Sequence, residues 1–325
     1  MTLASEAADA PAAAARQLAT LGPALDDLAR RLRARPPGFV VTCARGSSDH
    51  AATYGKYLLE TTVGCAVASM GPSIVSTYAT TPRLAGSLFI AVSQSGKSPD
   101  LVQLTTAARA AGALVVGMLN DTHSPLAKAC DVVLPLCAGE ERAVAATKSY
   151  LTSCLAFLQL AAHWTDAQAL HDAVQQAPEA LARALATDLS LTHLAPATSA
   201  YVVGRGVGLS AALELALKLK ETCRLHAEAF SAAELRHGPI ALVGPGFPIL
   251  ALSQDDRTLA SMREAIAHLE RLGASVTVLP EVDAPGVLAP LCHVQTCYRA
   301  LPALARARGV DADAPVHLEK VTRTV

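Results

Sequence analysis

The strongest constraint on the fold is an internal repeat, because residues 41–61 can be aligned with residues 201–222. The same offset of 160 or 161 positions returns further along the chain. Chance identities are common in an Ala-rich chain, but a nearly constant offset over four separate segments predicts two copies of one domain. The matched dipeptides are Arg45-Gly46 with Arg205-Gly206, Ala51-Ala52 with Ala211-Ala212, Glu60-Thr61 with Glu221-Thr222, Ser93-Gln94 with Ser253-Gln254, and Gly112-Ala113 with Gly273-Ala274.

Each copy alternates short apolar runs of β-type residues with longer Ala- and Leu-rich stretches of helical period. Such alternation is typical of β-α-β units and parallel sheets. The sequence therefore predicts an α/β fold with two tandem subdomains, each a doubly wound, mostly parallel sheet flanked by helices. We expect strands at residues 39–43, 88–93, 114–119, 132–134, 200–203, 249–253 and 275–279, with a short one at 293–296.

Length and composition narrow the class of protein. A chain of 325 residues suits two domains of about 150 residues each. The formal charge of −1 gives no electrostatic reason to expect nucleic acid or an anionic membrane as partner. No apolar run reaches the roughly 18 residues that span a bilayer. Eight cysteines without a Cys-x-x-Cys pair favour reduced thiols in a cytoplasmic protein, with no metal site.

The predicted domain limits follow from the repeat. We expect residues 1–35 to form a helical lead, frayed at its start because the Ala-rich N-terminus lacks the basic and apolar regions of a signal peptide. Residues 36–165 form the first copy, 166–195 a helical linker, and 196–325 the second copy.

Two serine-rich turns end strands of the first copy and open helices. Ser-Gln-Ser-Gly-Lys-Ser follows one strand, but a Walker loop would need Gly where Ala91 stands, so a nucleotide site is disfavoured. Serines that only cap two helices are the simpler alternative. Because both turns lie at carboxyl ends of strands, where ligands of such sheets bind, we predict one phosphate site per chain. Its candidate ligands are Ser47, Ser48, Ser93, Gln94, Ser95 and Ser98.

The second copy carries proton donors and acceptors instead. Glu214, Lys218 and Glu221 have helical spacing on one face, which on most helices is a solvated ion-pair ladder. Their neighbours are almost all Ala and Leu, which predicts a buried helix and therefore charges kept for a purpose. The chain then continues through His226, Glu228, Glu234 and His237, without the cysteines that a zinc deaminase requires. This set suits proton transfer on a phosphorylated small molecule without a redox cofactor.

The motifs RGSSDHAATYGKYLLE, SQSGKSPDL, AATKSYLTS, ALELALKLKE, HAEAFSAAELRHGP and LEKVTRTV resemble the sugar-isomerase (SIS) family over nearly the whole chain. The match is to the isomerase half of glutamine–fructose-6-phosphate aminotransferase and to SIS-type glucosamine-6-phosphate deaminases. The resemblance implies two SIS subdomains in a homodimer. It implies that Glu221 is the base that moves a proton between C1 and C2, and that His237 opens the sugar ring from the partner subunit. Lys320 resembles the active-site lysine of the tail, Lys218 and Glu214 a charge relay, and the serine turns the sugar-phosphate ligands.

Departures from the aminotransferase pattern direct the choice of reaction. Arg45 stands where those enzymes have Cys, and Lys97 stands where they have an acidic residue. The first cysteine is Cys43, so we expect no glutaminase nucleophile. We therefore expect a deaminase that converts glucosamine-6-phosphate to fructose-6-phosphate and ammonia. The alternatives are an aminotransferase-like or plain aldose–ketose isomerase without a glutaminase domain, a deaminase for another amino-sugar phosphate, and a non-catalytic sugar-phosphate sensor.

Overall fold

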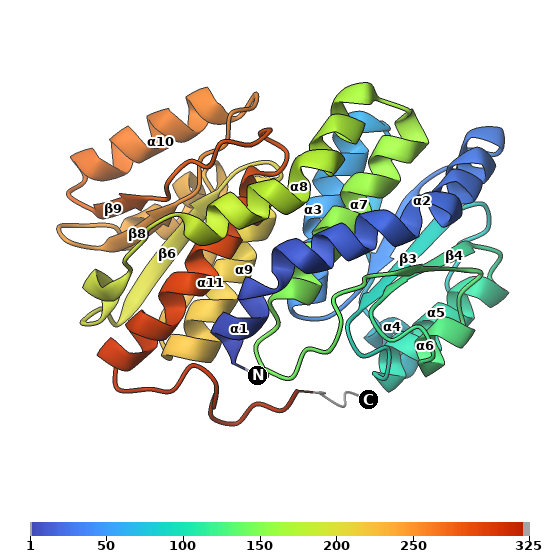
Figure 1. The fold of residues 1–325 in the computed structure, drawn as a ribbon, viewed down its shortest axis with the longest axis horizontal. Helices are drawn as coiled ribbons and strands as arrows, with labels where there is room; N and C mark the ends of the chain where they lie inside the picture. The colour runs from blue at the N-terminus through green and yellow to red at the C-terminus, as the bar shows by residue number, and fades with distance from the viewer. Residues whose placement is uncertain (1, 321–325) are drawn as a thin grey trace. The chain divides into compact units, whose positions relative to one another are not determined.

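A computed structural model describes residues 2–320, and the chain divides into two compact units (Figure 1). The first-sheet unit comprises Ala12–Glu141, Lys148–Gln175 and the chain from Glu319 onward. The second-sheet unit comprises the chain up to Pro11, Arg142–Thr147 and Gln176–Leu318. Each unit holds one parallel sheet and the helices that cover it.

The first sheet has five parallel strands in the order β2-β1-β3-β4-β5. Its central strand, with the sequence LFIAVS, is buried at all six positions. A parallel sheet covered on both faces favours such continuous apolar runs. The strands are β1 (Val40–Cys43), β2 (Val67–Ser69), β3 (Leu88–Ser93), β4 (Leu114–Leu119) and β5 (Val132–Pro135).

Helices pack on both faces of this sheet. Helices α3 and α7 lie side by side, and nearly every residue of α7 is buried, which fits its Ala- and Leu-rich sequence (Figure 1). The helices of this unit are α2 (Ala10–Ala34), α3 (Ser47–Thr62), α4 (Ser73–Ser76), α5 (Pro99–Ala110), α6 (Pro125–Lys128) and α7 (Lys148–Thr165). The boundary between the units falls inside α8 (Gln168–Ala186), within the predicted linker.

The second sheet has four parallel strands in the order β7-β6-β8-β9. This order repeats that of β2-β1-β3-β4, since each first strand is flanked by the second and the third. The two parallel sheets confirm the predicted α/β fold with two similar subdomains. The strands are β6 (Ser199–Gly204), β7 (His226–Ser231), β8 (Pro248–Ala251) and β9 (Ser275–Val278).

The second sheet is covered by its own helices, of which α9 packs against both β6 and α11. The α-helices are α1 (Leu3–Ala8), α9 (Gly208–Cys223), α10 (Leu259–Arg271) and α11 (Ala289–Ala307). Three short 3-10 helices complete the unit: η1 (Thr192–Leu194), η2 (Glu234–His237) and η3 (Pro239–Leu242).

The predicted strand at residues 293–296 is wrong, because this segment lies inside α11. Val294 and Thr296 are β-branched and favour a strand locally. Tertiary packing decides otherwise, since Leu291, Val294 and Tyr298 recur at helical spacing and are all fully buried. The edge strands β2 and β7, which the sequence did not reveal, are short or partly exposed.

The expectation of a frayed N-terminus is also wrong. Helix α1 begins directly after Thr2, whose side chain accepts a hydrogen bond from the Ser5 amide at 3.1 Å. Leu3 and Ala7 are fully buried, and α1 packs against α11. Packing in the second-sheet unit therefore holds α1 in place.

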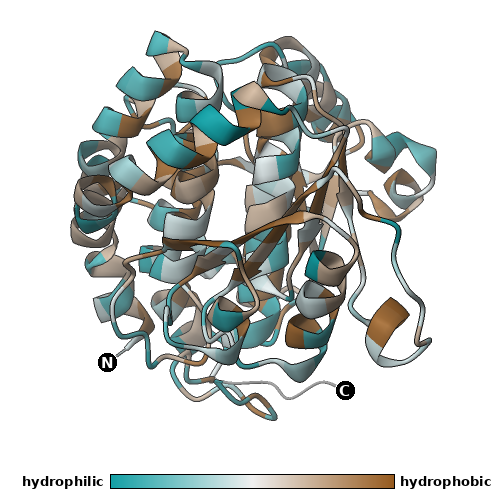
Figure 2. Ribbon diagram, turned by 90° about the vertical axis from the view of Figure 1, so that its right-hand side faces the viewer, coloured by the Kyte–Doolittle hydropathy of each residue, from teal (hydrophilic) through white to brown (hydrophobic). Residues whose placement is uncertain are grey.

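Hydropathy follows this layering. Figure 2 shows the strands as hydrophobic and the outer faces of many helices as hydrophilic, as expected of sheets covered by amphipathic helices. Among the helices of residues 2–320, none combines the length and the apolar character that crossing a membrane would require.

Candidate active site

The two serine-rich turns leave neighbouring strands at the same edge of the first sheet. Strands β1 and β3 are paired in parallel, with Cys43 opposite Ala91. One turn follows β1 and leads into α3 at Ser47, and the other follows β3 and leads into α5. Parallel pairing therefore brings Ser47 and Ser48 to the edge that also carries Gln94, Ser95 and Ser98.

The beginnings of α3 and α5 argue against serines that serve only as helix caps. The N-cap of α3 is Gly46, which has a positive φ and no side chain that could cap the helix, and Ser98 at the N-cap of α5 makes no side-chain capping hydrogen bond. In the same unit, Ser124 does cap α6 by accepting from the Ala127 amide at 3.3 Å. The two helices that open at the serine turns thus keep their positive dipole ends directed at the edge of the sheet.

The turn after β3 is shaped by its own serines. The Ser93 hydroxyl accepts from the Gly96 amide at 3.0 Å, and the Ser95 hydroxyl accepts from the Lys97 amide at 3.3 Å. Gly96 has φ +61°, and a Cβ there would overlap the Ser124 side chain. Ser93 is nearly buried, so it acts at least partly by fixing the turn, whereas Ser95 and Ser98 are more exposed.

Charged side chains link the two turns. The Arg45 guanidinium lies 2.8 Å from Asp100 Oδ2, and Asp100, in the first turn of α5, is 1% exposed. Asp100 also accepts from the Leu101 amide at 2.8 Å. Lys97 lies 3.7 Å from Asp121 at the surface. Burial raises the pKa of the Asp49 carboxyl in α3, an effect partly offset by His50 and Arg45.

The corresponding turn of the second sheet is filled by a side chain. Gln254 is 2% exposed and donates to the Arg205 carbonyl at 2.8 Å, and a Cβ on Gly208 would lie 2.6 Å from its Oε1. Asp256 accepts from the Thr258 amide at 2.7 Å, where an anion would otherwise bind. This filled and acidic turn supports the prediction of a single phosphate site in the first copy.

Helix α9 carries a lysine between two carboxylates. Lys218 Nζ lies 3.2 Å from Glu214 Oε1 and 2.6 Å from Glu221 Oε2. Lys218 and Glu214 are fully buried, whereas the Glu221 side chain is 20% exposed. Burial lowers the pKa of the Lys218 ammonium, but the two carboxylates more than offset this and hold that pKa above its usual value. The helix is therefore buried as predicted, and only the last carboxylate of the row reaches solvent.

A tyrosine from α11 completes this row. The Tyr298 hydroxyl donates to Glu214 Oε1 at 3.0 Å, and Tyr298 is fully buried. It satisfies one oxygen of a carboxylate that burial would otherwise destabilise. We call Glu214, Lys218, Glu221 and Tyr298 the α9 charge row. Through Lys218, this row orients the Glu221 carboxylate at the edge of the buried helix.

The other candidates of the second-sheet unit lie at its surface. His226 and Glu228 are exposed positions of β7, and Glu234 and His237 are exposed positions of η2. His237 precedes Gly238, which has φ +136° and ends η2. Within residues 2–320, no three His, Cys, Asp or Glu side chains gather in a way that could hold a metal ion.

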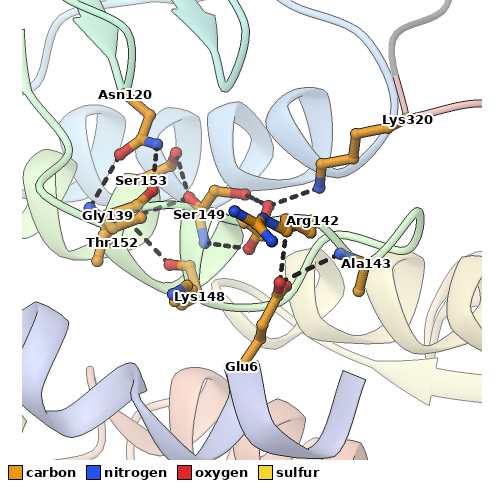
Figure 3. Close-up of polar contacts among 12 residues, drawn as sticks. Glu6, Asn120, Gly139, Arg142, Ala143, Lys148, Ser149, Thr152, Ser153 and Lys320 are labelled. Carbon is orange, nitrogen blue, oxygen red and sulfur yellow. Dashed lines mark hydrogen bonds and ion pairs between the residues drawn. The ribbon is translucent and has the colours of Figure 1, made fainter. Parts of the chain in front are cut away.

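Lys320 belongs to the first-sheet unit, together with the serine turns. Its Nζ lies 3.1 Å from Glu141 Oε2, and the Glu141 side chain is fully buried. Ser149 at the start of α7 donates to the same carboxylate (Figure 3). The residues that the sequence did not single out are thus Asp100, Glu141 and Tyr298. Each is paired with a charge more than 50 positions away, so no local pattern reveals it.

Comparison with known proteins gives the same family as the motifs. The SIS domain model matches residues 38–163 and 193–284. An isomerizing glutamine–fructose-6-phosphate aminotransferase from Symbiobacterium thermophilum is 33% identical over 318 residues, covering 86% of this chain and 51% of that protein. The Aeropyrum pernix enzyme of the same name is 35% identical over 316 residues, covering 87% of this chain and 51% of that protein. The chain spans about half the length of these curated relatives.

Solved structures agree. A Silicibacter pomeroyi protein provisionally named a phosphosugar isomerase matches with a TM-score of 0.90 and 39% identity, over 96% of this chain and 100% of that one. A glucosamine-6-phosphate deaminase from Thermotoga maritima matches with a TM-score of 0.73 over 97% of this chain and 100% of that one, but at 22% identity it supports only the fold. From its matched domains and relatives, the chain belongs to the SIS-domain family.

Proposed function

We propose that this protein is an amino-sugar phosphate deaminase that converts glucosamine-6-phosphate and water into fructose-6-phosphate and ammonia. The observation that carries the proposal is Lys218 buried between two carboxylates, of which only Glu221 reaches solvent. A partly exposed carboxylate held beside a buried ammonium suits a base that moves protons on a small substrate.

The serine turns bind the phosphate in this scheme. A phosphate group takes hydrogen bonds from hydroxyls and from the free amides at helix beginnings, and two helices begin at this edge of the first sheet. Ser47, Ser48, Gln94, Ser95 and Ser98 donate to the phosphate oxygens, while Ser93 also maintains the turn. The phosphate then fixes the position of the open-chain sugar.

Glu221 moves a proton between neighbouring carbons. It removes the C2 proton of the open-chain amino aldehyde, and the resulting enolamine regains a proton at C1. The oxygen on C1 gains one proton and the nitrogen loses one, which leaves a C2 imine. Water adds to this imine, ammonia departs, and a ketone remains at C2. Proton transfer by one positioned group contributes roughly 10²- to 10⁴-fold to such a rate.

His237 and Lys320 have further roles in the proposal. His237 assists opening of the sugar ring, and since it is exposed at the end of η2, we propose that it acts in the site of a second copy in a homodimer. Lys320 contributes its ammonium near the oxygens of the open-chain substrate.

Release of ammonia is proposed over plain isomerisation because of Arg45 and Lys97, the two departures from the aminotransferase pattern. Arg45 joins the two serine turns through Asp100, and Lys97 adds a second positive charge to the turn after β3. Both changes match the deaminase branch of the sequence resemblance. An isomerase that acts on a sugar phosphate without nitrogen is the second candidate.

Ammonia and ketose formation from glucosamine-6-phosphate tests the proposal, with Glu221→Gln as the variant. We expect both products from the wild type and a loss of at least about 100-fold in the variant. Glucose-6-phosphate, galactosamine-6-phosphate, and fructose-6-phosphate with ammonia or glutamine serve as parallel substrates. Ketose from glucose-6-phosphate without ammonia from the amino sugar would favour the plain isomerase. Wild-type rates in the variant would remove Glu221 from the mechanism.

A further inference from the structure

The last residue that the structure describes, Lys320, forms an ion pair with a buried carboxylate. Lys320 Nζ lies 3.1 Å from Glu141 Oε2, and the side chains of Lys320 and Glu141 are 23% and 0% exposed. The two residues are 179 positions apart and belong to the same first-sheet unit. The ammonium of an otherwise exposed segment is therefore directed at a charge inside the unit.

Ser149 fixes the orientation of this carboxylate. Its amide donates to Glu141 Oε1 at 3.0 Å and its hydroxyl donates to Glu141 Oε2 at 2.7 Å (Figure 3). Ser149 lies in the first turn of α7, where the positive end of the helix dipole also favours a negative charge. The same oxygen, Oε2, receives the Ser149 hydroxyl and the Lys320 ammonium.

A cap for α7 does not require a buried charge. A neutral oxygen from Ser, Thr or Asn satisfies the first amides of a helix equally well. A carboxylate withdrawn from water is costly unless a cation and several donors compensate it. Glu141 meets that condition through Lys320 and Ser149, which indicates that its charge serves the tail as well as the helix.

We propose that Glu141 is a positioning residue, which holds the Lys320 ammonium in place for the reaction proposed above, and on that reaction the proposal rests. The serine turns belong to the same unit, so this unit both binds the phosphate and fixes the reactive end of the tail. Ser149 supports the arrangement by keeping one carboxylate oxygen directed at Lys320.

A double-mutant cycle tests this coupling. Glu141→Gln removes the charge but keeps an oxygen that can accept from the Ser149 amide, so the cap of α7 is preserved. We expect it to lower kcat by about 10- to 100-fold, as misplacement of a reactive group does, with little change in KM for glucosamine-6-phosphate. In a Lys320→Met background, the same substitution should add almost nothing. Independent, multiplying losses, or an unchanged kcat in Glu141→Gln, would overturn the proposal.

Glu140→Gln is the matched control, because it makes the same chemical change one position earlier on an exposed side chain. It should keep the wild-type kcat. Glu141→Asp retains the charge on a shorter side chain and should restore part of the loss, which a role in helix capping alone does not predict. Thermal unfolding of each variant identifies any that fail to fold.

Acetylation of lysines, followed by mass spectrometry, gives a readout that needs no activity. We expect Lys320 to react about fivefold faster in Glu141→Gln than in the wild type, because its ion pair is lost. Exposed Lys220 serves as the internal reference and should react equally in both. If the wild type releases no ammonia but Lys320 is still protected by Glu141, the proposed reaction is wrong and the positioning contact stands. Equal labelling of Lys320 in both proteins would refute the contact.

Discussion

The two sheets of this protein share one strand order but differ at the edge where their helices begin. In the first sheet, the turn after β3 presents Ser95 and Ser98, and α5 begins without a side-chain cap. In the second sheet, the turn after β8 is occupied by the buried side chain of Gln254 and the carboxylate of Asp256. The same backbone plan therefore carries half-buried serines at this turn in one copy and a buried glutamine in the other, and we propose that only the first binds an anion.

Helix α3 follows the first strand of the first sheet, and α9 follows the first strand of the second. Here it is the second copy that carries the more unusual group, a buried ion pair. At an offset of 161 positions, Lys218 and Glu221 of α9 correspond to Tyr57 and Glu60 of α3. Glu60 pairs with Lys56 at 2.9 Å near the surface, where the two side chains are 33% and 41% exposed. In α9 the lysine is fully buried. The buried ion pair is thus found in the second copy, whereas the phosphate ligands that we propose lie in the first.

The largest expected effect is the loss of the buried lysine. Lys218→Met leaves the Glu214 carboxylate buried without its cation, and breaking a buried pair in this way costs about 3–5 kcal/mol. We expect that loss in the free energy of unfolding, measured by urea denaturation, together with loss of ammonia release. Lys56→Met makes the same chemical change at the ion-pair partner of Glu60 in the first copy, removes a more exposed pair and should cost at most about 1 kcal/mol.

A compensating variant separates stability from chemistry. Glu214→Gln combined with Lys218→Met removes both buried charges, so most of the stability should return while activity stays low. If Lys218→Met alone were as stable as Lys56→Met, burial of the α9 ion pair would not make it more important for stability than the exposed pair of α3.

The second largest expected effect is a loss of stability at low pH, which originates in the second-sheet unit. Burial lowers the pKa of His293 in α11 from 6.5 to about 4, and its Nδ1 has no hydrogen-bond partner among residues 2–320. Between these two values the unfolded chain binds a proton that the folded chain does not. Above pH 6.5 the neutral His293 does not lower the free energy of unfolding. As the pH falls from 6.5 to 4, that free energy decreases by up to about 3 kcal/mol.

Denaturation at several pH values measures this effect. His293→Leu should flatten the stability curve between pH 6.5 and 4, while His226→Gln, at an exposed position of β7, should keep the wild-type slope. An unchanged slope in His293→Leu would assign the acid sensitivity to another group.

The sequence predicted most of the architecture because the repeat and the alternation of elements are local patterns. The limits of β3 and β4 were predicted to the residue. The α11 segment was missed because its β-branched residues favour a strand, and only packing against α9 makes it a helix. That error also hid Tyr298, the α11 residue that contacts Glu214.

The candidate site shows the same division. Glu214, Lys218 and Glu221 lie on one helix, so their spacing predicted their contact. Glu141 and Asp100 are joined to Lys320 and Arg45 only by the fold. The sequence therefore could not predict Glu141 and Asp100, the carboxylates that pair with these charged residues.

The smallest effect tests the two turns directly. Ser93 and Ser253 occupy equivalent positions 160 residues apart and are both 6% exposed, so replacement by Ala is the same change in two copies. A hydrogen bond to a charged group is worth about 1.5–3 kcal/mol. Ser93→Ala should therefore raise KM for the sugar phosphate about tenfold or more, since it also removes the acceptor for the Gly96 amide. Ser253→Ala should leave KM unchanged because its turn is filled by Gln254.

Ser95→Ala, at a more exposed position, separates phosphate contact from turn support, since the Ser95 hydroxyl accepts only a longer bond, at 3.3 Å. Equal KM increases for Ser93→Ala and Ser253→Ala would mean that both copies bind the anion, and the division of roles between them would be wrong.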